Sequence, residues 1–215
     1  MDDSKRAFIR ANTEAMTPPH VPEIFLHLAG EAHALWRKTE EELAEIGLEP
    51  PFWAFAWAGG QGLARYVFDH PDCVSGRRVL DFATGSGLVA IAAAKAGASE
   101  VTASDIDPFC ETAVALNAGL NSVAIDYDGR DLVGSSLPAI DVLLAGDVFF
   151  DRAMSARLVP WFAELAQSGV DILVGDPGRS YLPRERLTLL DVYEVPVTRA
   201  LEDAEVKKTS VWRFL

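Results

Sequence analysis

The sequence has few cysteines, few basic residues and no long hydrophobic run. Its two cysteines, Cys73 and Cys110, lie far apart and match no metal-binding or redox spacing, which predicts buried or half-buried thiols in a reducing cytoplasm. The formal net charge of -13 leaves no surplus of Lys and Arg for a nucleic-acid surface and favours a basic or locally basic partner. No apolar stretch approaches the roughly 20 residues that span a bilayer, and nothing near the N-terminus marks the chain for export. We therefore expect neither nucleic acid nor a membrane as a partner.

Metal-binding and nucleophile motifs are absent as well. The four histidines show no ligand spacing, and three of them fall in the N-terminal region: His20, His27, His33 and His70. No serine or cysteine lies in a nucleophile motif. We therefore predict no metal site and no covalent nucleophile.

The length of 215 residues and the hydrophobic content of 49% suit one sizeable core. We expect an N-terminal helical extension over residues 1–50 and one α/β domain over residues 51–215. Within the extension, Glu31 to Glu45 has the spacing of an amphipathic helix, with Glu40 to Glu42 on its solvated face.

The most informative stretch is VLDFATGSG, from Val79 to Gly87. Its apolar residues suit a strand buried on both faces, and Gly85 and Gly87 permit a tight turn with close approach of a ligand. A helix is predicted from Leu88 to Ala96, because this segment is rich in Ala and Leu and Gly97 follows it. A strand, a glycine turn and a helix form half of a nucleotide-binding unit.

Two cofactors remain open for this turn, since Gly85-x-Gly87-x-x-Ala90 also satisfies the dinucleotide pattern. A pyrophosphate needs a helix N-terminus without nearby carboxylates, whereas S-adenosylmethionine brings a sulfonium and an ammonium. Asp81 precedes the turn and therefore favours the sulfonium cofactor. Asp105, at the end of the next predicted strand, can accept ribose hydroxyls of either cofactor.

Helices and strands alternate after the glycine turn, which predicts a parallel sheet with helices on both faces. The predicted strands are Val79 to Phe82, Glu100 to Ser104, Ser122 to Asp126, Asp141 to Ala145 and Val170 to Gly175, and the helices that follow are Pro108 to Leu120 and Arg152 to Gln167, the latter with a kink at Pro160. Leu189 to Val197 and Lys207 to Leu215 read as extended segments that close the sheet as an antiparallel pair. A dinucleotide-binding domain would need a sixth parallel strand and a separate substrate domain, for which the chain has little room.

Aromatic residues are crowded in PFWAFAWAGGQG, from Pro51 to Gly62. Phe52 and Phe55 are equally consistent with a core and with a ligand cage. Trp57, followed by Gly59 and Gly60, suggests a lid over a flat or cationic ligand.

The segment GDVFFD, from Gly146 to Asp151, follows the fourth predicted strand. Ligands bind at the carboxyl ends of parallel strands, so we expect Asp147 to face the cofactor and Asp151 to cap the next helix. Asp131, after the third strand, could receive an adenine amino group or lie in an exposed turn. In DPGRSY, Arg179 and Tyr181 lie on the same rim, although the segment also reads as a plain turn.

These segments resemble known families. VLDFATGSGL, ASDIDP and LLAGDVFFD look like motifs of the seven-β-strand methyltransferases, which implies a Rossmann-like sheet of five parallel strands plus a C-terminal antiparallel hairpin. PFWAFAWAGGQGLARY and DPGRSYLP resemble the lysine methyltransferases of the electron-transfer flavoprotein β-subunit, over roughly Pro50 to Leu215. That family has an Asp-x-x-Tyr or Asp-x-x-Phe motif near the acceptor nitrogen, and Asp147 to Phe150 matches its phenylalanine form, so no role of a tyrosine hydroxyl carries over.

The resulting site prediction has three parts. The cofactor-binding set is Trp57, Asp81, Thr84, Gly85, Gly87, Asp105, Ile106, Asp131 and Gly146. The catalytic set is Asp147 and Phe150, and the substrate channel is lined by Trp53, Phe149, Arg179 and Tyr181. We expect Asp147 to hold and aim a lysine ammonium that loses its proton to water, and the aromatic residues Trp53, Trp57 and Phe150 to shape the channel.

The resemblance implies S-adenosylmethionine as cofactor, no metal, and the flavoprotein β-subunit as protein substrate. Four alternatives stay open at this point: another protein substrate such as a ribosomal protein, a small-molecule substrate, a nicotinamide oxidoreductase, and a catalytically silent binding module.

Overall fold

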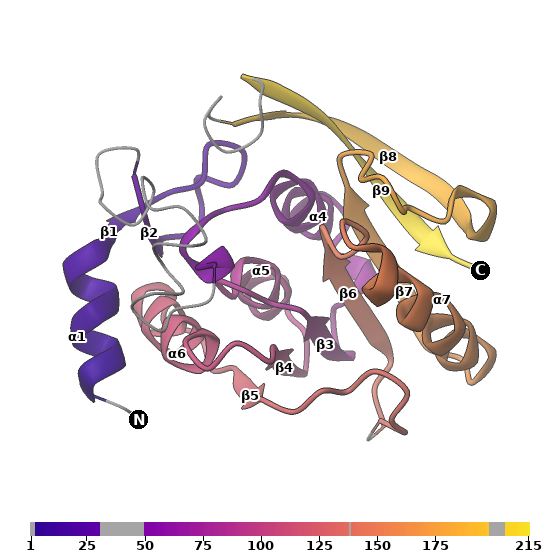
Figure 1. Cartoon of the computed structure of the whole chain (residues 1–215), viewed down its shortest axis with the longest axis horizontal. Coiled ribbons are helices and arrows are strands. Elements are labelled where there is room, and N and C mark those ends of the chain that lie inside the picture. The colour runs from indigo at the N-terminus through magenta and orange to yellow at the C-terminus, as the bar shows by residue number, and fades with distance from the viewer. Residues whose placement is uncertain (1–2, 31–49, 138, 198–204) are drawn as a thin grey trace.

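The computed structural model describes residues 3–30, 50–137, 139–197 and 205–215. The helix predicted from Glu31 to Glu45 lies outside these residues. A twisted sheet crosses the molecule, with helices α4, α5 and α6 on one face and α7 on the other (Figure 1). In the described part of the chain, no helix is both long and apolar enough to cross a bilayer.

Seven strands form the main sheet in the order β5-β4-β3-β6-β7-β9-β8. Their bounds are β3 Arg78–Phe82, β4 Glu100–Ser104, β5 Asp126–Asp128, β6 Val142–Gly146, β7 Asp171–Asp176, β8 Leu187–Pro196 and β9 Val206–Phe214. The first five pair in parallel, and β9 lies antiparallel between β7 and β8. The five parallel strands and the terminal antiparallel pair are confirmed, and β6 lies beside β3, as expected for a sheet whose order reverses there.

The third parallel strand is shorter and later than predicted. Ser122 to Asp126 was expected to be extended, but the strand covers Asp126–Asp128. Helix α6 (Cys110–Asn121) ends at Ser122, which takes a left-handed conformation with φ of 56°. The intervening residues return from the helix to the sheet, since a residue in this conformation ends a helix and reverses the chain direction.

Helices cover both faces of the sheet, and successive apolar side chains of a central strand point to opposite faces. On β6, Val142 and Leu144 pack under α4 (Ala58–Asp69) and α5 (Leu88–Lys95), whereas Leu143 and Ala145 pack under α7 (Arg152–Gln167). This period of two is what a strand buried on both faces requires. Short 3-10 turns cover Phe52–Ala54, Pro71–Cys73 and Arg184–Arg186.

The N-terminal segment packs against the same unit. Helix α1 (Asp3–Asn12) is followed by β1 (Glu14–Met16) and β2 (Leu26–Leu28), which form a separate antiparallel pair. Ile9 of α1 is fully buried in one apolar cluster with Trp53 and with Cys110 of α6. The domain boundary expected near residue 50 stays a prediction, and the extension contains strands as well as a helix.

Helix α4 lies unusually close to the ends of β6 and β7, because glycines face glycines. A Cβ atom added to Gly59 would lie 2.3 Å from the carbonyl oxygen of Gly175, and one added to Gly146 would lie 2.9 Å from Gly60. The expected lid is therefore wrong: Gly59 and Gly60 belong to a packed helix, and their small size permits contact between backbones.

Candidate functional site

Asp81 lies at the next-to-last position of strand β3 and organises the glycine turn. Its Oδ2 atom accepts hydrogen bonds from the Thr84 hydroxyl and, at 2.9 Å, from the Ala90 backbone N–H in the first turn of α5. Only 1% of the residue is exposed, and this burial raises the pKa of Asp81 to about 7 despite both hydrogen bonds. The turn itself uses left-handed backbone at Ala83, Gly85 and Gly87. A buried acid is thereby held where the N-terminus of a helix meets the sheet.

Asp105 directly follows the neighbouring strand β4 and braces the same turn. Its Oδ2 accepts the Gly85 N–H at 2.9 Å, and its Oδ1 accepts the Asp107 N–H at 3.1 Å. Carboxylate oxygens keep further lone pairs, so Asp105 can still accept hydroxyl hydrogens. The next residue, Ile106, is 72% exposed, an unusual position for a branched apolar side chain next to an acid. The pair offers hydrogen-bond acceptors for a ribose and an apolar surface for a flat ring.

Asp147 lies beyond the end of β6, on the opposite side of the crevice. It takes a left-handed backbone conformation with φ of 57°, which is uncommon for a residue other than glycine. Its Oδ2 accepts the Gly60 N–H of α4 at 2.9 Å, and its Oδ1 accepts two guanidinium N–H groups of Arg179, Nε at 3.1 Å and Nη2 at 2.7 Å. Trp57, which precedes α4, offers no capping side chain, so Asp147 supplies the acceptor for this helix start.

The loop after β7 brings Arg179 to this position through a turn built on Asp176. The Oδ1 atom of Asp176 accepts the N–H groups of Gly178 and Arg179, at 2.6 and 2.7 Å. Its Oδ2 atom is buried without a hydrogen-bond partner, and burial raises the pKa of Asp176. The segment is thus both a turn and part of the site.

Three aromatic side chains surround the entrance beside Asp147. The ring of Phe52 lies edge-on to both Trp57 and Phe150, with centroids 5.7 and 5.9 Å apart. The indole N–H of Trp57 donates to the Phe52 carbonyl at 3.0 Å, and the Arg179 guanidinium lies 5.7 Å from the Trp57 ring. Phe52 is 46% exposed. The sequence left its role open, and its exposure together with these contacts places it on the wall of the site.

Two predicted channel residues are core residues instead. Trp53 is 2% exposed and stacks on Phe109, with centroids 5.6 Å apart and planes inclined by 8°. Phe149 is fully buried and packs edge-on against Phe162 of α7. Neither side chain can line a channel in this structure, because packing already covers both.

The remaining predicted residues are exposed at the surface. Asp131 is exposed and forms an ion pair with Arg157 of α7 at 2.8 Å. Tyr181 is exposed, and its backbone N–H donates to the Phe149 carbonyl at 3.1 Å. Asp151 accepts the Met154 N–H at 2.7 Å and caps α7, as predicted.

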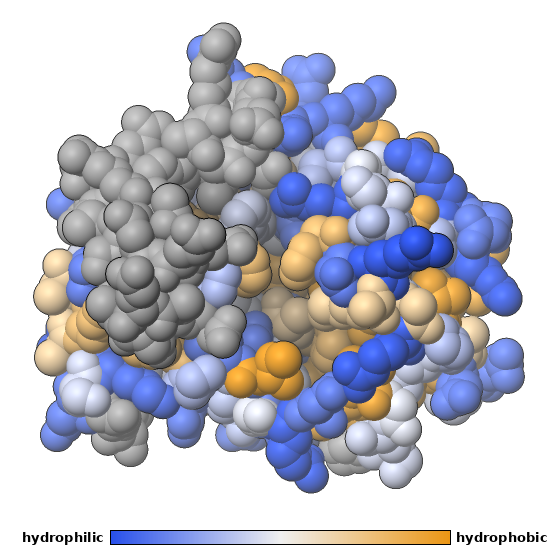
Figure 2. All heavy atoms as spheres, viewed as in Figure 1, coloured by the Kyte–Doolittle hydropathy of each residue, from blue (hydrophilic) through white to orange (hydrophobic). Residues whose placement is uncertain are grey.

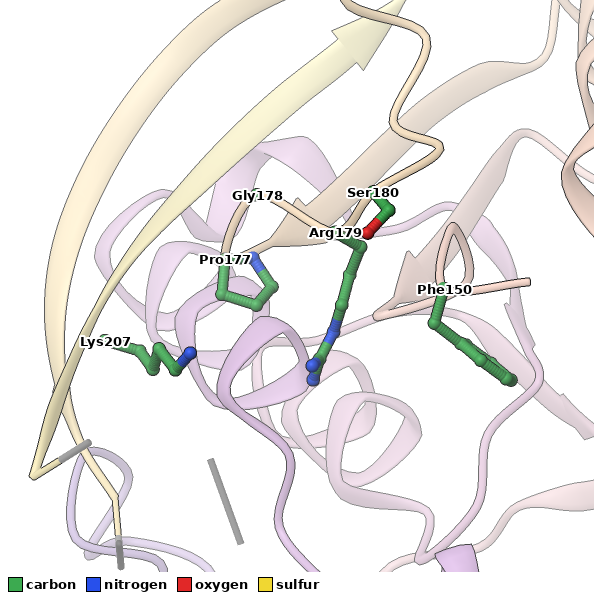
Figure 3. A pocket seen from close by; sticks show the side chains of 6 residues that line it. All are labelled: Phe150, Pro177, Gly178, Arg179, Ser180 and Lys207. Atoms are coloured by element: carbon green, nitrogen blue, oxygen red, sulfur yellow. The ribbon is translucent and has the colours of Figure 1, made fainter. Parts of the chain in front are cut away.

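A cavity of about 280 Å³ opens beside Asp147 and is lined by Phe150, Pro177, Gly178, Arg179, Ser180 and Lys207 (Figure 3). The side chain of Arg179 reaches into it between Phe150 and Lys207. Figure 2 shows a hollow near the middle of one face, with hydrophobic residues among its walls. Among the described residues, no group of three or more His, Cys, Asp and Glu could hold a metal ion.

A parallel sheet with an acid at the glycine turn, a second acid after the next strand and an open aromatic crevice defines a Rossmann-like methyltransferase. Solved structures agree on the fold. A ribosomal protein L11 methylase from Lactobacillus delbrueckii matches with a TM-score of 0.52 and 20% identity over 75% of this chain and 81% of that chain. Magnesium protoporphyrin IX methyltransferase from Synechocystis PCC 6803, with bound SAM, matches with a TM-score of 0.53 and 14% identity over 73% of this chain and 78% of that chain.

Sequence comparison then identifies the family. The electron transfer flavoprotein beta subunit lysine methyltransferase of Xenopus laevis is 37% identical over 97% of this chain and 86% of its own length. The Homo sapiens protein of the same name is 31% identical over 100% of this chain and 83% of its own length. A family model described as ribosomal protein L11 methyltransferase (PrmA) matches residues 69–145. The chain belongs to the family of the electron transfer flavoprotein beta subunit lysine methyltransferases.

Proposed function

We propose that this chain transfers methyl groups from S-adenosylmethionine to lysine side chains of the electron-transfer flavoprotein β-subunit. The observation that carries this proposal is similarity over nearly the whole chain to relatives named for that reaction. The geometry supports it, because the Asp147–Phe150 motif lies at the crevice next to an exposed aromatic wall. We further propose a cytoplasmic location, in keeping with two free cysteines.

The residues of the glycine turn suit this cofactor. Asp81 offers a buried carboxyl group whose ionised form a cationic ligand would favour, Asp105 offers hydroxyl acceptors, and Ile106 offers an exposed apolar face. Thr84, Gly85 and Gly87 shape the turn between them. When bound, S-adenosylmethionine supplies an electrophilic methyl group on a positively charged sulfur. Contacts of Asp131 and Gly146 with the cofactor stay predictions, as does the absence of a metal.

The acceptor lysine must lose its charge before it can react. Its ordinary pKa of about 10.4 makes the neutral amine cost roughly 4–5 kcal/mol at pH 7. The aromatic wall of Phe52, Trp57 and Phe150 favours the neutral amine by excluding water, and its faces accommodate a methylated ammonium. Asp147 aims the amine, and water takes its proton. Orientation then supplies most of the rate enhancement.

Replacing Asp147 by Asn tests this assignment. An asparagine keeps an oxygen acceptor for the Gly60 N–H but loses the carboxylate that aims the lysine amine. We expect kcat/KM for the flavoprotein β-subunit to fall roughly 10- to 100-fold, the cost of one charge-assisted hydrogen bond. Asp151→Asn is the matched control, since its carboxylate lies four residues further on and only caps α7. Turnover and lysine affinity at wild-type levels in Asp147→Asn would remove Asp147 from the site.

A ribosomal protein is the second candidate substrate, because the ribosomal-methyltransferase model also matches this chain. That match ends at residue 145, before Asp147, and therefore covers the cofactor half alone. Incubation of the enzyme with tritiated S-adenosylmethionine and an extract from a strain lacking it separates the candidates. We expect one labelled band at the mass of the flavoprotein subunit. A band from the ribosomal fraction, or label only in small molecules, would contradict the proposal.

A further inference from the structure

Both carboxylate oxygens of Asp147 already accept hydrogen bonds from the protein in this structure. Arg179 occupies Oδ1 with two N–H donors, and Gly60 occupies Oδ2. The ion pair is largely shielded, with 11% of the Asp147 side chain and 22% of the Arg179 side chain exposed. Charge-assisted hydrogen bonds away from bulk water are stronger than those of a surface pair. An incoming lysine therefore meets a carboxylate whose charge is already balanced.

Arg179 is fixed from three sides. The turn at Asp176 holds its backbone N–H, the Trp57 ring lies beside its guanidinium, and Asp147 accepts two of its N–H groups. Figure 3 shows the side chain extended into the cavity, between Phe150 and Lys207. Such a guanidinium acts as a fixed positive charge beside the wall of the lysine channel.

The charges around this pair have opposite effects on a lysine amine. A lone Asp147 carboxylate would stabilise the ammonium and so oppose methyl transfer, whereas a nearby guanidinium favours the uncharged amine. Further charged groups of the described residues lie on the elements around the pair, among them Arg184, whose guanidinium lies close to Gly178 of the same loop. Asp176 of β7 is oriented toward the turn, and Lys207 of β9 lines the same cavity and adds positive charge.

We propose that Arg179 is a positioning residue that orients Asp147 and keeps the acceptor lysine amine uncharged at neutral pH. Asp147 then aims the amine through a carboxylate whose charge Arg179 offsets, so that aiming does not lock the lysine as an ammonium. This inference rests on the proposed lysine methylation and adds to it a reason for the DPGRS loop to reach the site.

The test is the pH dependence of kcat/KM on the flavoprotein β-subunit for four variants. Arg179→Gln should move the acidic limb of the profile roughly one pH unit toward alkaline pH, which is a tenfold loss of rate below that limb. Arg179→Lys should keep the limb near its wild-type position with a lower plateau, because the charge stays and the paired hydrogen bonds are lost. In Arg179→Gln with Asp147→Asn, the limb should return toward the wild-type position, since no unpaired carboxylate remains.

Arg184→Gln is the matched control. It removes the same charge from the same loop, but its guanidinium lies over Trp212, 6.0 Å from the ring centre. We expect the wild-type profile from this variant. A merely structural role of Arg179 would lower the plateau in all Arg179 variants without moving the limb, and that result would overturn the inference.

A second measurement keeps this inference separate from the identity of the substrate. NMR titration of the Asp147 carboxyl group, in wild type and in Arg179→Gln, needs no substrate. We expect the titration midpoint to rise in the variant, because the neighbouring cation is gone. If the wild type fails to methylate the subunit, the proposed substrate is wrong. An unchanged midpoint would overturn the role of Arg179 in either case.

Discussion

Asp81 is a buried acid whose position is costly without a ligand. Because it has almost no exposure, its carboxylate gives up hydration and receives two hydrogen bonds from the described residues in return, from the Thr84 hydroxyl and the Ala90 N–H. The ordinary pKa of an aspartate, 3.8, rises to about 7 in the folded protein. A cationic ligand at the crevice would favour the ionised form, so cost and function arise from the same feature.

This shift predicts how stability depends on pH. The folded pKa lies above the unfolded one, so the contribution of Asp81 is fully present below pH 4 and is lost as pH rises through 7. Asp81→Asn cannot ionise and lacks this loss. Between pH 5 and pH 8 the wild type should lose roughly 2–3 kcal/mol of unfolding free energy relative to the variant. Urea unfolding of both proteins, without cofactor, measures the difference. An equal pH dependence would show that Asp81 is ionised throughout.

Single residues also show why part of the site escaped prediction from sequence. Phe52 and Trp53 are adjacent aromatics, and composition gives no reason to prefer one as a wall of the channel. The 3-10 turn over Phe52–Ala54 orients them differently, so that Trp53 stacks on Phe109 in the core and Phe52 meets Phe150 at the surface. The pairing of Arg179 with Asp147 depends on contact between two strand ends that are far apart in sequence, and only the sheet order reveals it.

At the scale of elements, the start of α4 has no room for a side chain where it meets β7. A Cβ atom added to Gly59 would clash with the Gly175 carbonyl and the Asp147 carboxylate. A Cβ atom added to Gly60 would lie 3.9 Å from side-chain atoms of Leu88 and Val89, which is an ordinary contact. The two glycines are neighbours in sequence with opposite surroundings. A flexible lid and a tightly packed helix start produce the same sequence pattern, Trp57 followed by glycines, and packing alone separates the two.

Gly59→Ala should therefore destabilise the protein by roughly 1–3 kcal/mol or more, because the helix must move away from β7. It should also weaken methylation, since the Asp147 carboxylate must shift. Gly60→Ala is the control, and helix propensity predicts an unfolding free energy equal to or up to about 1 kcal/mol above wild type. Thermal unfolding and activity of both variants check this. Equal behaviour of the two alanine variants would show that the close contact between α4 and β7 does not form.

The strands were predictable to the degree that their apolar runs are distinct. β6 and β7 were predicted to within a residue at each end, because buried parallel strands are continuous apolar segments. Glu100–Ser104, which mixes apolar and polar residues, was predicted to the residue from its place between the helix after the glycine turn and Asp105. The edge strand β5 has only three residues, Asp126–Asp128, and two of them are acidic. Such a strand exists through its pairing with β4, and its own sequence carries no signal for it.

At the scale of the molecule, the order of strands turns separate motifs into one crevice. Asp81 lies on β3 and Asp105 follows the adjacent strand β4, while Asp147 follows β6 on the other side of β3. The cofactor turn and the acceptor motif thus open on the same edge of the sheet, at the point where the strand order reverses. The terminal pair β8 and β9 extends the sheet beyond β7 and brings Lys207 to the cavity. Arrangement, more than any single motif, assembles the site.

This arrangement makes a prediction for the whole protein, because a ligand that binds only the folded state stabilises every element at once. S-adenosylhomocysteine at 100 times its Kd should add about 2.7 kcal/mol, which for a chain of this size raises Tm by roughly 5–10 °C. Asp105→Asn should reduce the rise, since it weakens acceptors at the glycine turn. Asp128→Asn is the control with the same charge change on the next strand, where Asp128 pairs with Arg130, and it should keep the rise. NAD should leave Tm unchanged, because a pyrophosphate would meet the carboxyl group of Asp81 at the glycine turn. A rise with NAD and none with S-adenosylhomocysteine would mean that this acidic turn binds a dinucleotide, and the assignment of both cofactor and reaction would fail with it.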